Sequence, residues 1–337
     1  MATRTQRLLG ALGLLSAATM TGRRWWEARY GLEGRVVLIT GGSRGLGLLL
    51  AREYGRHGAR LALVARDAAA LERACRELSG AGIEAFGFPT DVSDERQVAE
   101  MIEKVIERFG RLDVVVNDAG RIEVGPLESM TVHDFQTAMD TNFWGAFHVI
   151  NAALQHLVPG GRVVNISSLG GLLSVPHLLP YSASKFALTG FSLGLRMELE
   201  REGIAVTTVC PGLMRTGSPL NAWFKGDASA EYTWFSVAGS LPLLSVGGER
   251  AARAIVRASR RGDVLLVLGI PAKLAALLNA LLPGSLVRIA SLATRLLPQD
   301  TSLTMRRGRD LDRRTPRWMT ARGDLAAARN NELVRPS

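Results

Sequence analysis

The sequence is poor in cysteine and shows no cluster of metal-binding side chains. Its two cysteines, Cys75 and Cys210, are far apart in a chain of 337 residues, and Cys210 falls in an apolar run typical of a buried strand. Neither a disulfide framework nor a metal site is therefore predicted. The five histidines form no catalytic motif and are interpreted as structural or solvated: His57, His133, His148, His156 and His177. A Ser-His-Asp hydrolase is accordingly not expected, and the scarcity of cysteine favours a reducing, cytoplasmic location.

Long hydrophobic runs are also absent. The N-terminal apolar stretch from Leu8 to Met20 is shorter than the roughly 20 residues of a membrane span. Arg4 and Arg7 precede it, as in a signal peptide. Three more arginines follow closely, however, and positive charge directly after an apolar segment opposes translocation. We expect residues 1–33 to be an apolar and basic extension that serves as an anchor or docking helix, with secretion as the less favoured alternative.

Acidic residues are too few to balance Lys and Arg, which leaves a net charge of +10. Most of the excess lies at the two ends of the chain. Residues 1–35 hold six Arg against two Glu, and residues 298–337 hold nine Arg against five acids. A nucleic-acid-binding domain would carry its basic stripe on a folded face beside base-reading or stacking residues, and the sequence contains no such arrangement. No nucleic-acid partner is predicted.

Short β-branched apolar runs alternate with longer helical patterns from Arg35 onward, which predicts a parallel sheet with helices on both faces. Strands are predicted at 36–40, 60–65, 84–89, 112–117, 162–167, 205–210 and 264–268. Helices are predicted at 45–57, 68–79, 94–109, 131–156, 181–202 and 249–260. The fold class is therefore α/β, a Rossmann-type doubly wound parallel sheet of about seven strands, in a catalytic domain spanning 34–269 with a C-terminal helical extension.

Three segments fall outside this alternation. Residues 213–248 are long, apolar and rich in aromatics, which predicts a lid. Residues 270–297 carry leucines at steps of three and four, which predicts an amphipathic helical extension. Its leucine stripes suit packing over the cleft or at a subunit interface, which we favour slightly, and they also suit contact with the inner face of a membrane. Residues 298–337 are expected to form a basic, poorly ordered tail.

A glycine-rich turn follows the first predicted strand and opens the first predicted helix. It reads Thr40-Gly41-Gly42-Ser43-Arg44-Gly45-Leu46-Gly47. Glycine at 41, 45 and 47 permits a tight turn and a close approach, so that backbone N–H groups and the helix dipole can meet a pyrophosphate. An isolated glycine cluster would indicate only a turn, but the strand before it and the helix after it predict a dinucleotide site.

The residue at the end of the second strand selects between the nicotinamide dinucleotides. An acid there binds the ribose 2′-hydroxyl of NAD, whereas arginine pairs with the 2′-phosphate of NADP. This sequence has Ala65 followed by Arg66, with Asp67 one place late, and Arg44 offers a second cation. NADP(H) is therefore predicted over NAD(H), with a solvated strand-end charge as the alternative interpretation of Arg66.

A phenol and an ammonium lie four residues apart in Tyr181-Ser182-Ala183-Ser184-Lys185, hence on one face of a helix. The reference pKa of a phenol is about 10, and a neighbouring ammonium with the cationic oxidised nicotinamide would lower it toward neutrality. Ser168 ends a strand shortly before, at the carboxyl edge where a doubly wound sheet builds its site. This combination predicts Tyr181 as the proton-transferring residue, with Lys185 and Ser168 as its partners.

Across about residues 34–268, the order and spacing of these motifs resemble those of the short-chain dehydrogenases/reductases. The linked motifs are TGGSRGLG at 40–47, Asp91-Val92, Asn117-Asp118-Ala119-Gly120, Asn142, Ser168, YSASK at 181–185, and Pro211-Gly212 with Thr216. One departure is Asp118, where such families usually have a second Asn. We expect a tolerated turn substitution, with altered cofactor affinity as the alternative.

The resemblance implies cofactor contacts along most of these motifs. The matching residues are Gly41, Ser43, Arg44, Gly45, Leu46, Gly47, Arg66, Asp91, Val92, Asn117, Ala119, Gly120, Tyr181, Lys185, Pro211, Gly212 and Thr216. Asp91 and Val92 would lie by the adenine, and Thr216 would reach the carboxamide. Lys185 would hold the nicotinamide ribose.

Catalytic roles follow from the same resemblance. Ser168 would orient the carbonyl, and Tyr181 would give or take the proton while C4 of the nicotinamide moves hydride. Asn142 would join a water relay to Lys185. The implied activity is NADP(H)-dependent interconversion of a ketone or aldehyde and an alcohol.

The substrate is predicted to be small and hydrophobic, because the lid and residues 169–179 are both apolar. The alternative is that the lid aromatics only pack the lid onto the domain or a subunit. We also expect a homo-oligomer. Two other functions are less favoured, namely a membrane-associated NADPH-binding or scaffold protein with weak or no catalysis, and an epimerase or dehydratase on a related fold.

Overall fold

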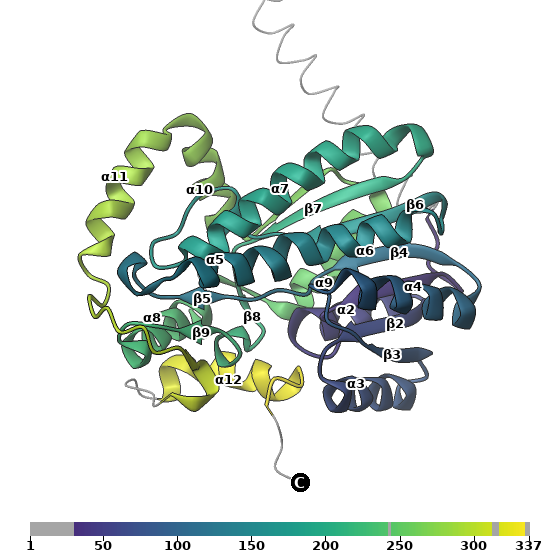
Figure 1. Cartoon of the computed structure of the whole chain (residues 1–337), viewed down its shortest axis with the longest axis horizontal. Helices are drawn as coiled ribbons and strands as arrows, with labels where there is room; N and C mark the ends of the chain where they lie inside the picture. The colour runs from purple at the N-terminus through teal and green to yellow at the C-terminus, as the bar shows by residue number, and fades with distance from the viewer. Residues whose placement is uncertain (1–29, 242–243, 312–316, 334–337) are drawn as a thin grey trace, which may run out of the picture.

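The computed structural model describes residues 30–241, 244–311 and 317–333. At its centre lies a seven-stranded sheet in the order β3-β2-β1-β4-β6-β7-β11, in which all neighbouring strands run parallel (Figure 1). The strands are β1 (Val36–Thr40), β2 (Arg60–Ala65), β3 (Ala85–Pro89), β4 (Leu112–Asn117), β6 (Leu157–Ile166), β7 (Ala205–Pro211) and β11 (Leu265–Leu268). The predicted Rossmann-type doubly wound sheet is confirmed.

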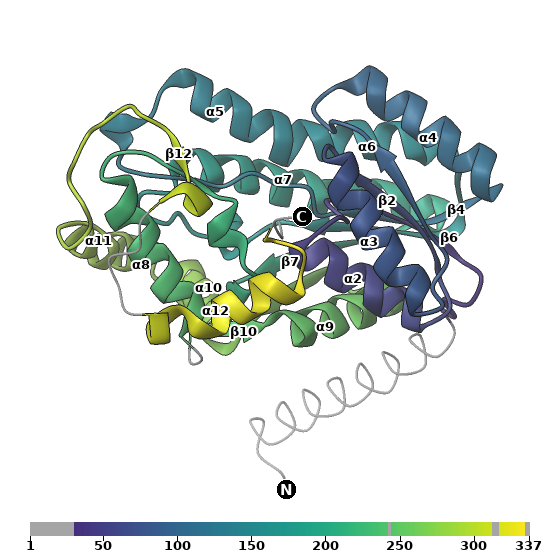
Figure 2. The same cartoon turned by 90° about the horizontal axis from the view of Figure 1, so that it is seen from below.

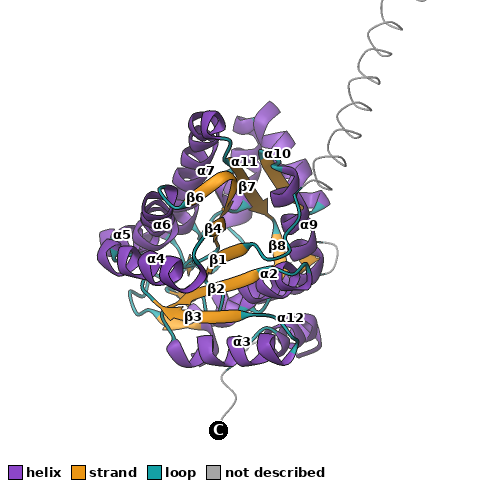
Figure 3. Ribbon diagram, turned by 90° about the vertical axis from the view of Figure 1, so that its right-hand side faces the viewer, coloured by secondary structure: helices purple, strands orange, loops and turns teal. Residues whose placement is uncertain are grey.

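Helices cover both faces of the sheet (Figure 3). One layer contains α4 (Glu95–Phe109), α6 (Gly145–Leu154) and α7 (Leu179–Leu199), and the other contains α2 (Gly45–Arg56), α3 (Ala68–Gly80) and α9 (Gly248–Arg261). Successive side chains of a strand point to opposite faces. Val36 and Leu38 of β1 accordingly join the core under α4, while Val37 and Ile39 join the core under α2 and α9. Both faces of β1 are therefore buried, as the continuous apolar run of this strand requires.

Two predicted elements differ from the structure by more than three residues or in their continuity. β6 begins at Leu157, five residues early, because Leu157 pairs with Leu112 across a register shift in β4. The single helix predicted over 131–156 is divided into α5 (Val132–Met139), a π-helical turn η2 (Asp140–Trp144) and α6. Single π-helical turns inside helices are frequent at functional sites, and this one contains the predicted site residue Asn142.

The lid contains β8 (Leu213–Arg215), β9 (Trp223–Phe224), α8 (Ala228–Ser240) and β10 (Ser245–Gly247). Its aromatic side chains Phe224, Tyr232 and Phe235 are buried together in a third apolar cluster. These three aromatics therefore pack the lid, which is the alternative interpretation of their role. Glu231 of α8 also ties the lid to the preceding loop, because its carboxylate is 2.6 Å from His177 Nδ1. His177 is structural, as predicted.

The C-terminal region is more ordered than the predicted poorly ordered tail. After α10 (Ile270–Leu281) and α11 (Pro283–Thr294), the chain forms β12 (Arg306–Arg307) and the short turn η6 (Gly308–Asp310). β12 pairs antiparallel with β9, and β9 in turn pairs with β5 (Glu123–Val124). The helix α12 (Arg317–Arg329) packs beside α8 and leads toward α2 (Figure 2). Pairing with the lid is thus what orders this region.

Some predicted features lie outside the described residues, namely the apolar stretch from Leu8 to Met20 and residues 312–316 and 334–337 of the tail. Among the residues that are described, no helix is both long enough and apolar enough to cross a membrane.

Candidate active site

The chain order of the sheet reverses between β1 and β4, and ligands bind such sheets in the crevice at the carboxyl ends of these strands. Thr40 ends β1, and its Oγ1 accepts hydrogen bonds from the backbone N–H groups of Asp118 and Ala119, both at 3.1 Å. These bonds hold the turn after β4 against the glycine-rich turn. Predicted site residues from both turns therefore meet at one edge of the sheet.

A buried chain of side-chain hydrogen bonds joins three strands to α7 beneath this edge. Asn117 Nδ2 donates to Asn165 Oδ1 at 2.9 Å, and Asn165 Nδ2 donates to Ser192 Oγ at 3.0 Å. Thr208 Oγ1 donates to the same Ser192 oxygen at 2.7 Å. The predicted cofactor residue Asn117 thus uses its amide nitrogen to tie β4 to β6, while its buried Oδ1 has no partner within the described residues.

Three predicted catalytic residues lie together next to this network. Tyr181 and Lys185 are one turn apart near the start of α7, and Lys185 Nζ is 5.9 Å from the centre of the Tyr181 ring. Lys185 Nζ donates to the carbonyl of Ile166, the last residue of β6, at 2.8 Å. Ser168 lies two residues after the end of β6, and its Oγ accepts from the Gly170 N–H at 3.0 Å beside the Tyr181 phenol.

Burial shifts the pKa values of the phenol and the ammonium in opposite directions. It raises the pKa of Tyr181 to about 12, against the influence of the Ser168 hydroxyl. It lowers the pKa of Lys185 to about 8, against the influence of the Asp118 carboxylate. Burial thus outweighs the Ser168 hydroxyl, and the protein groups around Tyr181 do not lower its pKa on their own. The lowering expected from the sequence also invoked the cationic nicotinamide. The phenol stays protonated near neutral pH, which is the form that donates a proton.

The side-chain amide of Asn142 is occupied by protein groups. Its Oδ1 accepts from the Arg121 N–H at 2.8 Å, and its Nδ2 donates to the Arg121 carbonyl at 3.0 Å and to Ser184 Oγ at 2.9 Å. Ser184 precedes Lys185 on α7, so these bonds position the helix that carries Lys185. The water relay predicted between Asn142 and Lys185 stays a prediction.

The glycine-rich turn leaves space for a ligand at one of its three predicted glycines. Gly41 and Gly47 are required by the turn itself, because an added Cβ would lie 3.0 Å from Ala119 N and 2.2 Å from the Gly41 carbonyl oxygen respectively. Gly45 has a φ of +57°, and a Cβ there would meet only the carboxylate of Glu332, at 2.6 Å. The surface above Gly45 thus accepts an anionic group, as a dinucleotide site requires.

The charges of three arginines, Arg44, Arg66 and Arg309, act on a fourth, Arg307. Burial lowers the pKa of Arg307, and the charges of the other three lower it further. The Nε atoms of Arg307 and Arg309 are buried and have no partner among residues 30–241, 244–311 and 317–333. A phosphate bound near these guanidinium groups would offset the repulsion acting on Arg307. Arg307 and Arg309 could not be assigned to the site from the sequence, since they follow the predicted catalytic domain and belong to no motif.

The remaining predicted cofactor residues divide into exposed and packed positions. Arg66 is exposed at the end of β2, with its Nη1 3.6 Å from Asp91 Oδ2. Val92 is buried in the core against Gly145, where an added Cβ would lie 2.7 Å from it. Gly212 lets α10 approach, since a Cβ there would be 2.9 Å from that of Ala272. The positions buried most deeply among the others are Ser43, Leu46, Pro211 and Thr216.

The C-terminal segment 330–333 enters the same cleft, which the sequence did not indicate. The Gly45 N–H donates to the Asn330 carbonyl at 2.8 Å. The Glu332 carboxylate is 3.8 Å from Arg44 Nε and is almost completely buried. Two residues of the predicted cofactor turn are therefore bonded to the chain's own C-terminal segment.

A doubly wound sheet, a glycine turn after β1, and a tyrosine and lysine on the helix after β6 together define a dinucleotide-dependent oxidoreductase. The chain belongs to the short-chain dehydrogenase family, whose family model matches residues 35–223. The matched segment contains the glycine turn, Tyr181 and Lys185. The predicted resemblance is confirmed, and the protein is an oxidoreductase that uses a nicotinamide cofactor.

Particular relatives agree with this assignment. The chain is 39% identical over 188 residues, 55% of its length and 72% of the relative's, to a Streptomyces coelicolor protein whose name is that of a ketoacyl reductase. A dehydrogenase/reductase from Sinorhizobium meliloti superposes with a TM-score of 0.63 at 30% identity, over 74% of this chain and 99% of that one. A Burkholderia cenocepacia short-chain dehydrogenase in complex with NADP gives a TM-score of 0.63 at 26% identity, over 72% of this chain and 99% of that one.

Asp118, the departure from the family pattern, is next to the glycine turn. Its carboxyl accepts a hydrogen bond from the Gly47 N–H, and burial raises its pKa to about 8. Lys185 lowers this pKa and the Glu332 carboxylate raises it further. The carboxyl is therefore mostly neutral at pH 7, where it resembles the asparagine usual in the family.

Replacing Asp118 by Asn should change how cofactor affinity depends on pH. A raised pKa means that the neutral carboxyl predominates below about pH 8 and that a negative charge appears above it, beside an anionic cofactor. The Asp118→Asn variant should bind NADPH as tightly as the parent at about pH 6.5 and several-fold more tightly at about pH 9. Titration calorimetry would measure both. Lys185 also loses its charge as the pH rises, but it does so in the parent and in the variant alike. A ratio of their two dissociation constants that does not change with pH would therefore contradict the raised pKa assigned to Asp118.

Proposed function

We propose that this protein is an NADP(H)-dependent oxidoreductase that interconverts a hydrophobic ketone or aldehyde and the corresponding alcohol. The observation that carries the proposal is the meeting of Ser168, Tyr181 and Lys185 at the carboxyl ends of β4 and β6, next to the glycine turn. A non-catalytic scaffold role is not favoured, because such a protein has no need of this arrangement.

In the direction of reduction, the proposed role of Tyr181 is to donate its phenolic proton to the substrate oxygen. The raised pKa of about 12 keeps that proton available at neutral pH. Ser168 is proposed to orient the carbonyl by a hydrogen bond. Lys185, fixed by the Ile166 carbonyl at 2.8 Å, is proposed to hold the cofactor ribose near Tyr181. The nicotinamide, when bound, supplies or accepts the hydride.

The preference for NADP(H) over NAD(H) rests on the arginines around the glycine turn. Arg66 directly follows β2, where a ribose 2′-phosphate is expected in this fold. Arg44, Arg307 and Arg309 add positive charge to the same region. Arg66 Nη1 lies 3.6 Å from Asp91 Oδ2, and the Arg66 side chain is 59% exposed, so it is accessible to a phosphate. The Burkholderia cenocepacia relative in complex with NADP supports the same preference.

The proposed substrate class rests on the apolar surroundings of Tyr181. Its ring is partly buried against the lid cluster, together with Ile122, Val175 and Trp234. A hydrophobic carbonyl compound fits such surroundings better than a sugar or an acid does. The ketoacyl reductase name of the Streptomyces coelicolor relative supports a polyketide-like or acyl ketone. Loss of NADPH absorbance with a panel of hydrophobic ketones and sugars tests this, and a preference for sugars would contradict it.

The helices α10 and α11 are proposed to contact an anionic membrane surface. Ala272 is the only buried residue of α10, and α11 has none. α11 stands away from the sheet in Figure 1. The exposed apolar side chains are Ile270, Leu274, Leu277, Leu278, Leu281, Val287, Ile289 and Leu292. The adjoining groove between α9, α10 and α12 is lined by eight cations and one acid, Glu249. Cations beside an apolar stripe complement anionic lipid headgroups.

Replacing Tyr181 by Phe should remove turnover while leaving the affinity for NADPH nearly unchanged. The phenol donates the proton but does not anchor the cofactor, so kcat should fall by about 10² to 10⁴-fold. Steady-state kinetics and titration calorimetry measure the two effects. Tyr232→Phe removes a hydroxyl from the lid core and serves as the control with normal turnover. Substantial reductase activity in Tyr181→Phe would contradict the proposed mechanism.

Replacing Arg66 by Asp should shift the preference from NADPH toward NADH. The change removes a phosphate partner worth about 1.5 to 3 kcal/mol and supplies a ribose acceptor, so the ratio of kcat/KM values should change about ten- to a hundredfold. Arg76→Asp makes the same charge change on α3, where Arg76 pairs with Glu72, and should leave the ratio unaltered. An unchanged ratio in Arg66→Asp would mean that Arg66 is only a solvated charge.

Placing glutamates at Leu277 and Leu281 should abolish most co-sedimentation of the full chain with anionic vesicles. Both leucines are more than half exposed, and charged side chains there would oppose insertion. A control with glutamates at Val132 and Met197, which are also exposed, should bind like the parent. Unchanged vesicle binding of the Leu277 and Leu281 variant would contradict the proposal. If the parent is a dimer that binds no vesicles, and the variant is a monomer, the surface would instead be assigned to a second copy of the chain.

A further inference from the structure

Residues 330–333 form several specific bonds with the cofactor turn and its neighbours. The Gly45 N–H donates to the Asn330 carbonyl at 2.8 Å, so this donor is not available to a phosphate. Asn331 Nδ2 donates to the Ser43 carbonyl at 2.8 Å and to the Ala70 carbonyl at 3.2 Å. The Asn331 side chain thus links a backbone carbonyl of the glycine-rich segment to one at the start of α3.

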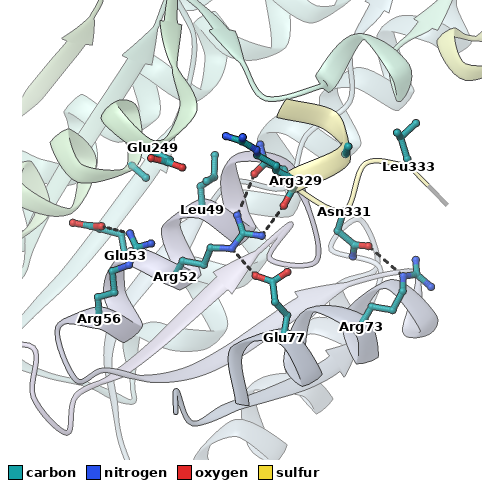
Figure 4. A pocket seen from close by; sticks show the side chains of 13 residues that line it. Leu49, Arg52, Glu53, Arg56, Arg73, Glu77, Glu249, Arg329, Asn331 and Leu333 are labelled. Atoms are coloured by element: carbon teal, nitrogen blue, oxygen red, sulfur yellow. Dashed lines mark hydrogen bonds and ion pairs between the residues drawn. The ribbon is translucent and has the colours of Figure 1, made fainter. Parts of the chain in front are cut away.

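Two arginines, one on α2 and one on α3, also hold the segment through hydrogen bonds, as Figure 4 shows. Arg52 of α2 donates to the Arg329 carbonyl at 2.7 Å and to Asn330 Oδ1 at 3.1 Å. Arg73 of α3 donates to Asn331 Oδ1 at 3.2 Å. Arg52 is itself oriented by Glu77, at 2.6 Å. Together with the glycine turn, α2 and α3 therefore all form bonds to the C-terminal segment.

Glu332 occupies the surface that the glycine turn leaves open. Its carboxylate accepts from Asn221 Nδ2 and is influenced by the charges of Arg44 and Arg309. Its Oε1 is 2.6 Å from the position of a Cβ on Gly45. A diphosphate that approached this turn closely would overlap the carboxylate and would compete with Asn330 for the Gly45 N–H. The cofactor and the docked segment therefore exclude each other.

We propose that residues 330–333 are an internal ligand of the cofactor site, in which the Glu332 carboxylate takes the place of the cofactor diphosphate and must leave before the cofactor binds. This inference rests on the proposed function, since it assigns the glycine turn to a nicotinamide dinucleotide. Its consequence is that the apparent dissociation constant equals the intrinsic one divided by the fraction of molecules in which the turn is open.

Burial makes the docked carboxylate replaceable. It raises the pKa of Glu332 to about 7 although Arg44, Asn221 and Arg309 act in the opposite direction, so these partners do not fully offset the loss of water. A diphosphate carries more negative charge toward the same arginines. The exchange is therefore favoured when the cofactor is present, and the segment closes the turn when it is not.

The test is a pair of substitutions in the full chain, Asn331→Ala and Glu332→Ala. Asn331→Ala removes the bonds to Ser43, Ala70 and Arg73 without changing any charge, so a gain in affinity cannot arise from reduced repulsion of an anionic cofactor. Both variants should bind NADPH about tenfold more tightly than the parent, measured by titration calorimetry. Asp324→Asn, whose carboxylate accepts from Thr320 at 3.1 Å on α12, is the control and should bind like the parent.

Hydrogen exchange of the parent protein tests whether residues 330–333 leave the site when the cofactor binds or instead close over the bound cofactor. While residues 330–333 are docked, the N–H groups of Asn330 and Glu332 donate to the carbonyls of Ala326 and Ala327 at the end of α12. Saturating NADPH should speed their exchange if the segment leaves. Slower exchange on NADPH addition, or Asn331→Ala and Glu332→Ala affinities equal to that of the parent, would overturn the inference while leaving the proposed function intact. Failure of the parent and of both variants to bind NADPH or NADH would instead refute the proposed function itself.

Discussion

The hydrogen bonds that run from Asn117 through Asn165 to Ser192 fix how α7 lies on the sheet. Each of these polar side chains is almost fully buried, and a buried amide or hydroxyl that loses its partner costs about 1 to 3 kcal/mol. Sliding α7 by one residue would remove Ser192 from both Asn165 and Thr208. The network therefore allows one register of α7, and this register places Lys185 Nζ at the Ile166 carbonyl. Apolar packing alone would not select that register as sharply, because similar apolar side chains can replace one another with little loss.

Most of the sheet and the predicted catalytic set could be inferred from the sequence because local signals mark them. Strands such as Val36–Thr40 and Leu112–Asn117 are short apolar runs bounded by turn residues, and their predicted bounds match the structure. The segment from Tyr181 to Lys185 places two functional groups on one helix face wherever that helix lies. The pKa of Tyr181 could not be inferred in this way, because it depends mainly on how deeply the folded chain buries the phenol.

No such local signal in the sequence marks the C-terminal residues that lie at the glycine turn. α12 and residues 330–333 are held by individual hydrogen bonds to Arg52, Arg73 and the glycine turn, and such bonds leave no periodic pattern in the sequence. Their partners lie more than half the chain away, so only the fold brings them together. The same reasoning applies to Phe224 and Phe235, since an apolar lid segment predicts burial but not whether the aromatic rings face a substrate or one another.

The excess positive charge of the C-terminal region thus serves more than one purpose. Arg307 and Arg309 return to the glycine turn, where their charges act on each other and on Arg44. While Glu332 is docked, it neutralises part of this cluster. Once it leaves, the positive charge of Arg44, Arg66, Arg307 and Arg309 is no longer offset by this carboxylate, and a concentrated positive potential attracts an anionic dinucleotide and raises its association rate. The charges that retain the carboxylate in the closed state are therefore the charges that draw in the cofactor that replaces it.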